Sequence, residues 1–193
     1  MPKAQRIMII RHAEKPDVDS KGKHHGVRPD GVRPDGVKSE ESLTVRGWQR
    51  AGAISLLFGS AEIAQTRGLS VPQHLYASDP EKADKAGSNS RRPQQTLTPL
   101  AKRLELIINA DWLAGQEAEL CRDALTKPGT SLISWQHELI PAIAAAIPGG
   151  NILQTRTWDD ARFDLVWVFD LLPDGTYSFK EFHQALLSGD LDI

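Results

Sequence analysis

The sequence predicts a three-layer α/β/α fold with a mostly parallel central sheet and a C-terminal hairpin at one edge. Short apolar segments rich in β-branched residues alternate along the chain with amphipathic segments of helical period, as in α/β proteins. The last two apolar segments are separated by the turn Pro173-Asp174-Gly175, which predicts the hairpin. A length of 193 residues suits one domain, spanning 1–193, with a core of its own.

Composition argues against several classes of partner. The formal net charge is −2 at pH 7, so no basic surface indicates a nucleic acid or an anionic membrane as partner. No apolar run approaches the length that spans a bilayer, and Ile7–Ile10 is too short for the core of a signal peptide. Cys121 is the single cysteine, so no intrachain disulfide forms, which fits a reducing compartment. We therefore expect a soluble, cytoplasmic protein.

The first strand is predicted at Ile7–Ile10, because a short continuous apolar run is typical of a strand that is buried on both faces. Arg11 and His12 follow it and would lie at its carboxyl end, where open α/β sheets bind ligands. Four further strands are predicted, the last two forming the hairpin: His74–Ser78, Thr130–Trp135, Asp164–Leu171 and Tyr177–His183.

The first helix is predicted over Val45–Phe58, with Thr44 as its N-cap. Its apolar face would be formed by Val45, Trp48, Ile54 and Leu57. The other predicted helices are Gln94–Ile108, with a break near Pro99, then Gln116–Leu125, and Glu138–Ile147, in which Pro141 is tolerated only near the first turn.

Two polar stretches, 16–42 and 79–90, are predicted to be exposed loops inserted near the site. The first carries a tandem Gly-Val-Arg-Pro-Asp repeat at 26–35, a period too short for a solenoid. His24 and His25 lie in this loop without carboxylates or cysteines at ligand spacing. We expect a solvated pair there rather than a metal site.

Two histidines, two arginines and a carboxylate follow predicted strands: Arg11, His12, Arg92, His137 and Glu138. Parallel strands end at the same edge of a sheet, so we expect these side chains to converge. A neutral imidazole is a competent nucleophile toward phosphorus, and guanidinium groups pair with phosphate oxygens at any working pH. Phosphoryl transfer needs positioning and charge neutralisation, which this set supplies without a metal or a cofactor.

These residues stand in segments that resemble the histidine phosphatase superfamily, which includes the cofactor-dependent phosphoglycerate mutases. Residues 11–14, Arg-His-Ala-Glu, are similar to the family's Arg-His-Gly-Glu signature, and 43–51 resemble its Leu-Thr-x-x-Gly-x-x-Gln-Ala segment. Residues 76–78 and 92–96 resemble the two halves of its Ser-x-x-x-Arg-Ala-x-Gln-Thr block, and His137 takes the place of its second histidine. The matches occur in the family's order, and they imply a phosphoglycerate mutase-like fold.

The resemblance implies that His12 is transiently phosphorylated and that Arg11, Arg92 and His137 bind the phosphate. Arg92 is assigned this role rather than Arg91, because its spacing to the following Gln-Thr pair fits the family pattern. We expect Arg91 to be a solvated charge. The family usually needs no metal.

The general acid has several candidates. Glu138 directly follows the second histidine, as an acidic residue does in one branch of the family. In the mutase-like branch the acid lies between the second strand and the second arginine, where this chain has Asp79, Glu81 and Asp84. Glu138 is favoured, although an acidic residue in the first turn of a helix also has a purely structural explanation.

We therefore expect a metal-independent phosphatase that hydrolyses phosphomonoesters or phosphohistidine through a phosphohistidine on His12. Its substrate would be a phosphorylated small molecule or a phosphoprotein. One alternative is a non-catalytic phospholigand-binding module on the same fold. Another is a phosphomutase, against which the inserted stretches 16–42 and 79–90 argue. The sequence leaves the substrate and the oligomeric state open.

Overall fold

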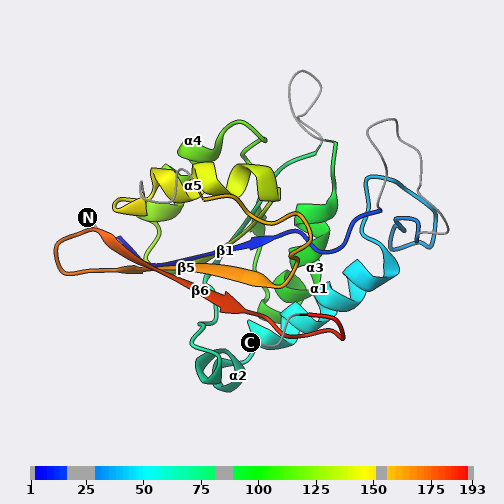
Figure 1. The fold of residues 1–193 in the computed structure, drawn as a ribbon, viewed down its shortest axis with the longest axis horizontal. Coiled ribbons are helices and arrows are strands. Elements are labelled where there is room, and N and C mark those ends of the chain that lie inside the picture. The colour runs from blue at the N-terminus through cyan, green and yellow to red at the C-terminus, as the bar shows by residue number, and fades with distance from the viewer. Residues whose placement is uncertain (1–2, 17–28, 81–88, 151–155, 191–193) are drawn as a thin grey trace.

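The computed structural model describes residues 3–16, 29–80, 89–150 and 156–190 (Figure 1). Within these ranges, six strands form one sheet in the order β3-β2-β4-β1-β5-β6. The strands are β1 Ala4–Arg11, β2 His74–Ala77, β3 Ile108–Asn109, β4 Gly129–Trp135, β5 Leu165–Leu171 and β6 Tyr177–His183. The helices are α1 Val45–Leu57, α2 Ala61–Thr66, α3 Arg92–Leu104, α4 Glu117–Thr126 and α5 Ile140–Ala146.

The sheet is mostly parallel. β4 pairs in parallel with both β1 and β2, and β3 adds a short parallel edge beyond β2. β5 runs antiparallel to β1, and its hairpin with β6 forms the opposite edge. The turn of that hairpin has Gly175 at φ 87°, a conformation that glycine adopts without strain. The predicted sheet with a C-terminal hairpin at one edge is confirmed.

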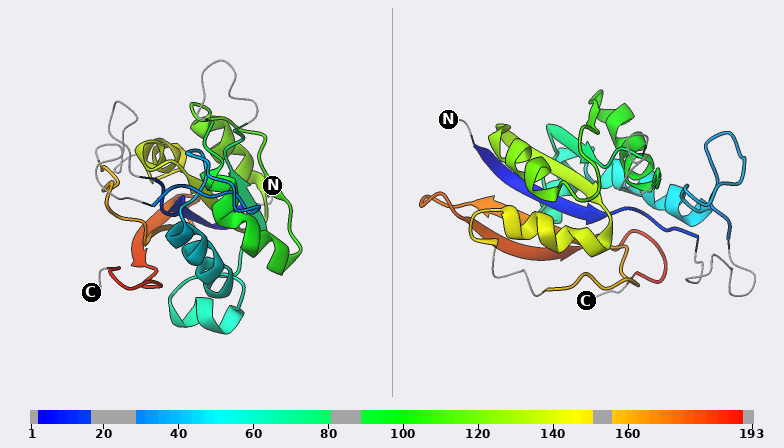
Figure 2. Two further views of the ribbon diagram at one scale, coloured as in Figure 1. Left: turned by 90° about the vertical axis from the view of Figure 1, so that its right-hand side faces the viewer. Right: turned by 90° about the horizontal axis from the view of Figure 1, so that it is seen from above.

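Helices cover both faces of the sheet, with α4 and α5 on one face and α1 and α3 on the other (Figures 1 and 2). The central strand β1 explains this layering. Side chains alternate between the faces of a strand, so Ile7 and Ile9 pack in the cluster of α4 and α5. Met8 and Ile10 pack in the cluster of α1 and α3. The continuous apolar run therefore supports two cores, and the predicted three layers are confirmed.

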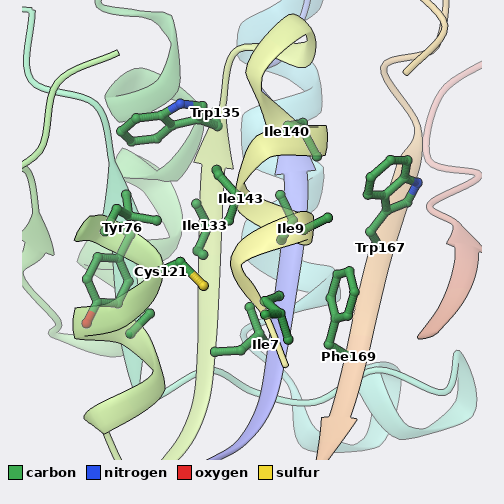
Figure 3. Close-up of a cluster of buried hydrophobic side chains, with 14 of the residues drawn as sticks. Ile7, Ile9, Tyr76, Cys121, Ile133, Trp135, Ile140, Ile143, Trp167 and Phe169 are labelled. Carbon is green, nitrogen blue, oxygen red and sulfur yellow. The ribbon is translucent and has the colours of Figure 1, made fainter. Parts of the chain in front are cut away.

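Figure 3 shows the core beneath α4 and α5. Ile140 and Ile143 of α5 lie over β1, and Trp167 extends this core from β5. Cys121 of α4 is buried here as a small hydrophobic residue. Trp158 and Trp167 pack in the same core.

Helix α1 begins where Thr44 predicts, because the Thr44 hydroxyl accepts a hydrogen bond from the N–H of Gly47 at 3.1 Å. Ile54 is buried as predicted, whereas Val45 is 58% exposed and its assignment to the apolar face is wrong. Val45 lies nine residues before Ile54, which places it about half a turn away around the helix.

The predicted helix over Gln94–Ile108 is wrong in two respects: it does not extend to Ile108, and it has no break near Pro99. α3 continues through Pro99, because its apolar face packs on the sheet on both sides of that proline. The helix ends where Glu105 adopts a left-handed conformation at φ 56°. Ile108 belongs to β3 instead, where it pairs with β2.

The predicted helix over Glu138–Ile147 is divided. Its start is a 3₁₀ turn over His137–Leu139, and α5 follows at Ile140. Pro141 lies in the first turn of α5, as predicted. A regular α-helix that began at Glu138 would need the N–H of residue 141 to donate to the carbonyl of His137, and proline has no N–H.

Helix α2 has no counterpart in the sequence prediction. It is capped by Ser60 and buries only Ala64, so it shows no apolar period from which it could be predicted. α4 agrees with the predicted helix over Gln116–Leu125 to within a residue at each end. No helix in the described ranges is long and apolar enough to cross a membrane.

The described part of the stretch 16–42 is largely the exposed loop that the sequence predicts, with residues 33–37 exposed, except around Gly31. Gly31 pairs with Thr44 in an isolated antiparallel bridge, and Gly31 is buried. A Cβ atom at Gly31 would lie 2.2 Å from the carbonyl oxygen of Ser39, so the close approach of the backbone requires glycine. The pair His24-His25 lies outside the described residues.

Candidate active site

The carboxyl ends of three parallel strands form one edge, and the first histidine lies there. The register pairs Arg11 of β1 with Trp135 of β4, and Ser134 of β4 with Ala77 of β2. The pairing continues for one residue beyond β1, where the N–H of His12 donates to the carbonyl of Trp135 at 2.9 Å. His137 lies two residues after Trp135, the last residue of β4. Both histidines therefore follow strands that end side by side.

Two helices hold the turn that follows β1. The N–H of Ala13 donates to Oγ1 of Thr96 at 2.9 Å, and that hydroxyl donates to the carbonyl of Arg92 at 2.8 Å. On the other side, the N–H of Thr44 donates to the carbonyl of Glu14 at 3.0 Å. The start of α3 and the start of α1 are thereby fixed against the residues around His12.

Helix α1 approaches this turn closely. A Cβ atom at Gly47 would lie 2.5 Å from the carbonyl oxygen of Glu14, so only glycine fits. Gln95 ties the segment before α1 to α3, because its Oε1 accepts from the N–H of Leu43 at 2.9 Å and its Nε2 donates to Oγ of Ser42 at 3.0 Å. The motif residues on α1 and α3 therefore act as supports for the turn.

His12 is buried, with its ring held in one orientation. Its Nδ1 lies 2.7 Å from the carbonyl oxygen of Ala13. A carbonyl can only accept, so Nδ1 carries the proton and Nε2 keeps its lone pair. Burial lowers the pKa of His12 well below 6.5, and the charges of Arg92, Arg11 and Lys15 lower it further. The imidazole is therefore neutral at neutral pH, as a nucleophile must be.

A pocket of about 380 Å³ opens beside His12. It is lined by His12, Lys15, Arg92, Gln136, Glu138 and Leu139. The structure thus brings three of the predicted site residues together in one hollow. Lys15 and Gln136 also line it, and neither was assigned a role from the sequence. Lys15 stands only three residues after His12, within the same motif, and could have been found from that spacing.

Arg92 is the first residue of α3 and supplies a positive charge to the pocket. Its Nη1 donates to the carbonyl of Glu40 at 2.7 Å, whereas its buried Nε has no hydrogen-bond partner among the described residues. Burial lowers the pKa of Arg92, but a guanidinium stays charged at any working pH. Arg91 is exposed, in agreement with the prediction.

Several buried donors of the site have no partner within the described part of the chain. They are Nε of Arg11, Nε of Arg92 and Nε2 of Gln136. Buried donors are almost always satisfied in folded proteins. An excess of cationic and neutral donors in one place fits an anionic ligand that accepts several hydrogen bonds.

Arg11 and His137 do not line the pocket beside His12. Arg11 is fully buried, with its guanidinium 3.8 Å from the centre of the Phe163 ring. It donates through Nη1 to the carbonyl of Asp160 and through Nη2 to Oδ1 of Asp160 at 2.9 Å. Nε2 of His137 lies 3.1 Å from the same Oδ1. Arg11 and His137 therefore share Asp160 as a partner, and the sequence analysis did not identify Asp160.

Glu138 borders the pocket as an ionised carboxylate. Its Oε2 lies 3.0 Å from Nδ1 of His137, an ion-pair distance without hydrogen-bond angles. This contact lowers the pKa of Glu138 to about 2, with Lys15 adding to the effect. Among the other candidate acids, Asp79 does not line the pocket. Glu81 and Asp84 lie outside the described residues.

A second hollow of about 390 Å³ is lined by side chains whose charges pair with one another. The buried Arg50 lies 2.9 Å from Oε1 of Glu14 and 2.6 Å from Oδ1 of Asp190. Arg162 lies 2.7 Å from Oδ1 of Asp164. These groups bind each other, so the hollow offers a ligand far less free charge than the pocket beside His12.

The sequence matches no family model and no curated protein. Solved structures do share the fold. One is titled mycobacterial hydrolase 1, with a TM-score of 0.50 and 14% identity over 93% of this chain and 98% of that chain. Another is a mycobacterial glucosyl-3-phosphoglycerate phosphatase with VO3, with a TM-score of 0.50 and 15% identity over 92% of this chain and 97% of that chain.

These likenesses extend over nearly the whole of both chains. They show that this protein has the phosphoglycerate mutase-like fold, as the sequence motifs imply. A shared fold at this identity does not carry over a substrate. The argument for an activity therefore depends on the geometry around His12.

Proposed function

We propose that the protein is a phosphatase that hydrolyses phosphomonoesters or phosphohistidine through a phosphohistidine on Nε2 of His12. The observation that carries the proposal is the state of this ring. It is buried and neutral, its Nδ1 proton is held by the carbonyl of Ala13, and its unprotonated nitrogen stands in a pocket shared with Lys15 and Arg92. An activated nucleophile beside fixed positive charge is the arrangement that phosphoryl transfer needs.

The reaction has two steps. First, Nε2 of His12 attacks phosphorus and a P–N bond forms, while the bond from phosphorus to the leaving group breaks. The leaving atom, an oxygen in a phosphomonoester or an imidazole nitrogen in a phosphohistidine, takes up a proton. Second, water attacks the same phosphorus, passes a proton to a base, and the P–N bond breaks to release inorganic phosphate. Arg11, Arg92 and His137 would stabilise the charge on the equatorial oxygens in both steps.

Glu138 lines the pocket and is the candidate for both acid and base. It is ionised in the free protein, since its pKa is about 2, and it becomes a stronger base for the second step when a bound phosphate raises that pKa. To act as the acid of the first step it must first gain a proton. An approaching phosphate dianion favours this, because a nearby negative charge raises the pKa of a carboxyl group.

The test is hydrolysis of an aryl phosphate by the wild type and by His12→Ala. We expect the variant to lose turnover by at least about a thousandfold while it keeps its fold by circular dichroism. His74→Ala is the matched control, because that histidine binds the carbonyl of Pro128 and does not line the pocket. Equal turnover in the wild type and in His12→Ala would exclude the mechanism. Phosphate binding without any turnover by the wild type would indicate a binding module instead.

A further inference from the structure

The side chain of Asp160 makes contacts that a bound phosphate would make. Its Oδ1 accepts from Nη2 of Arg11 at 2.9 Å and lies 3.1 Å from Nε2 of His137. Nζ of Lys15 approaches the same oxygen to 3.6 Å. Three side chains, from the last residue of β1 and from the segments that follow β1 and β4, therefore meet at one carboxylate oxygen. Arg11 and His137 are also two of the three groups to which the proposed function assigns phosphate binding.

A carboxylate and a phosphate compete for such donors, because both present anionic oxygens at similar hydrogen-bond distances. Nη2 of Arg11 donates a hydrogen bond to Oδ1 of Asp160, and Nε2 of His137 lies within ion-pair distance of the same oxygen, so a phosphate oxygen cannot take that position at the same time. We propose that Asp160 holds the phosphate position as an internal competing ligand and leaves it when substrate binds. This inference rests on the proposed function.

The local structure lets the carboxylate leave without loss of Arg11. The backbone carbonyl of Asp160 accepts from Nη1 of Arg11, and the ring of Phe163 packs against the same guanidinium. These two contacts hold the backbone in place. The side chain of Asp160 is 70% exposed, so rotation about its Cα–Cβ bond carries the carboxylate into solvent. Arg11 then keeps its position, and its Nη2 becomes free to donate to a ligand.

The exchange also sets a preference among ligands. A ligand must interact with Arg11, Lys15 and His137 more strongly than Asp160 does. A phosphomonoester dianion brings two charges and three free oxygens, whereas a carboxylate or a sulfate ester brings one charge. The competing carboxylate therefore favours dianionic phosphomonoesters over monoanionic ligands.

The experiment compares Asp160→Asn with the wild type by calorimetric titration with inorganic phosphate, and by kcat and KM for an aryl phosphate. Loss of the competing charge should lower the Kd for phosphate and the KM by about three- to tenfold, without a fall in kcat. Asp159→Asn is the matched control. It removes the same charge one residue away, where the side chain only accepts from the N–H of Ala161 at 2.8 Å.

Weaker or unchanged phosphate binding in both Asp160→Asn and Asp160→Ala would overturn the inference, because Asp160 would then merely position Arg11 and His137. Hydrolysis by the wild type would still support the proposed function in that case. Tighter phosphate binding by Asp160→Asn without hydrolysis by either protein would support the competing ligand and contradict the phosphatase. No phosphate binding by either protein would contradict both.

Discussion

The ion pair between Arg50 and Asp190 gives a prediction whose magnitude follows from the structure. Asp190 accepts from Nη2 of Arg50 at 2.6 Å and from the N–H groups of Leu186 and Leu187 at 2.8 and 3.0 Å. Its side chain is 5% exposed. Arg50 also binds Glu14, two residues after His12, so the pair connects the C-terminal segment to the turn of the active site.

These contacts hold the pKa of Asp190 at about 2, against 3.8 for a free aspartate. Because the folded-state pKa is lower, the carboxylate stabilises the fold at pH values above about 4. This stability is lost as the pH falls from about 4 toward 2. The difference between the two pKa values corresponds to about 2 kcal/mol at neutral pH. We expect Asp190→Asn to lose that amount, or about 4 to 8 °C in Tm for a chain of this size.

The assay is urea unfolding of the wild type and Asp190→Asn at pH 7 and again near pH 3. The difference in the free energy of unfolding should shrink as the pH falls. Glu119→Gln serves as a control, since Glu119 is exposed on α4 and should change stability by a few tenths of a kcal/mol. A difference between wild type and Asp190→Asn that is the same at both pH values would refute the ion-pair explanation.

Three further predictions concern the reaction. The kcat/KM of the wild type should stay level as the pH falls through 6.5 and drop only well below it, because the pKa of His12 is lowered. An acid limb centred at or above pH 6.5 in a pH–rate profile would contradict this. Thr96→Val should lower the stability by about 1 to 3 kcal/mol, since it leaves the buried N–H of Ala13 unpaired, and should lower kcat at least about tenfold by loosening His12. Denaturant titration and steady-state kinetics would measure both effects, and a stable variant with full kcat would show that Thr96 does not position the turn. Dialysis against EDTA should leave turnover unchanged, and activity that is lost and then restored by a divalent metal would show that the proposed chemistry is wrong.

The sequence predicts the layers and the edge of the sheet that carries the site, because both follow from local patterns. A continuous apolar run such as Ile7–Ile10 is enough to predict a strand that is buried on both faces. Arg11, His12 and His137 follow strands directly, so chain order and parallel pairing bring them together. The two-residue strand β3 and the helix α2, with its single buried side chain, carry too little periodic signal to be predicted.

The missed part of the site depends on contacts between distant residues. Asp160 lies in an irregular segment before β5 and meets Arg11 across 149 positions of the chain. No local pattern marks it, because its importance comes only from the guanidinium and imidazole that surround it. The low pKa of Glu138 has the same origin, since it depends on how the ring of His137 lies beside it. The sequence could identify Glu138 as a candidate acid, but it could not predict that this carboxyl group is ionised in the free protein.

The phosphoenzyme is the most direct measurement of the central claim. The wild type is mixed with a labelled aryl phosphate, stopped in alkali within milliseconds, and examined by ³¹P NMR and peptide mapping. The account predicts one phosphoryl group on a nitrogen of His12, stable in alkali and lost in acid, and absent from His12→Ala. Steady hydrolysis by the wild type with no such species under any stopping condition, or with label on another residue, would contradict it.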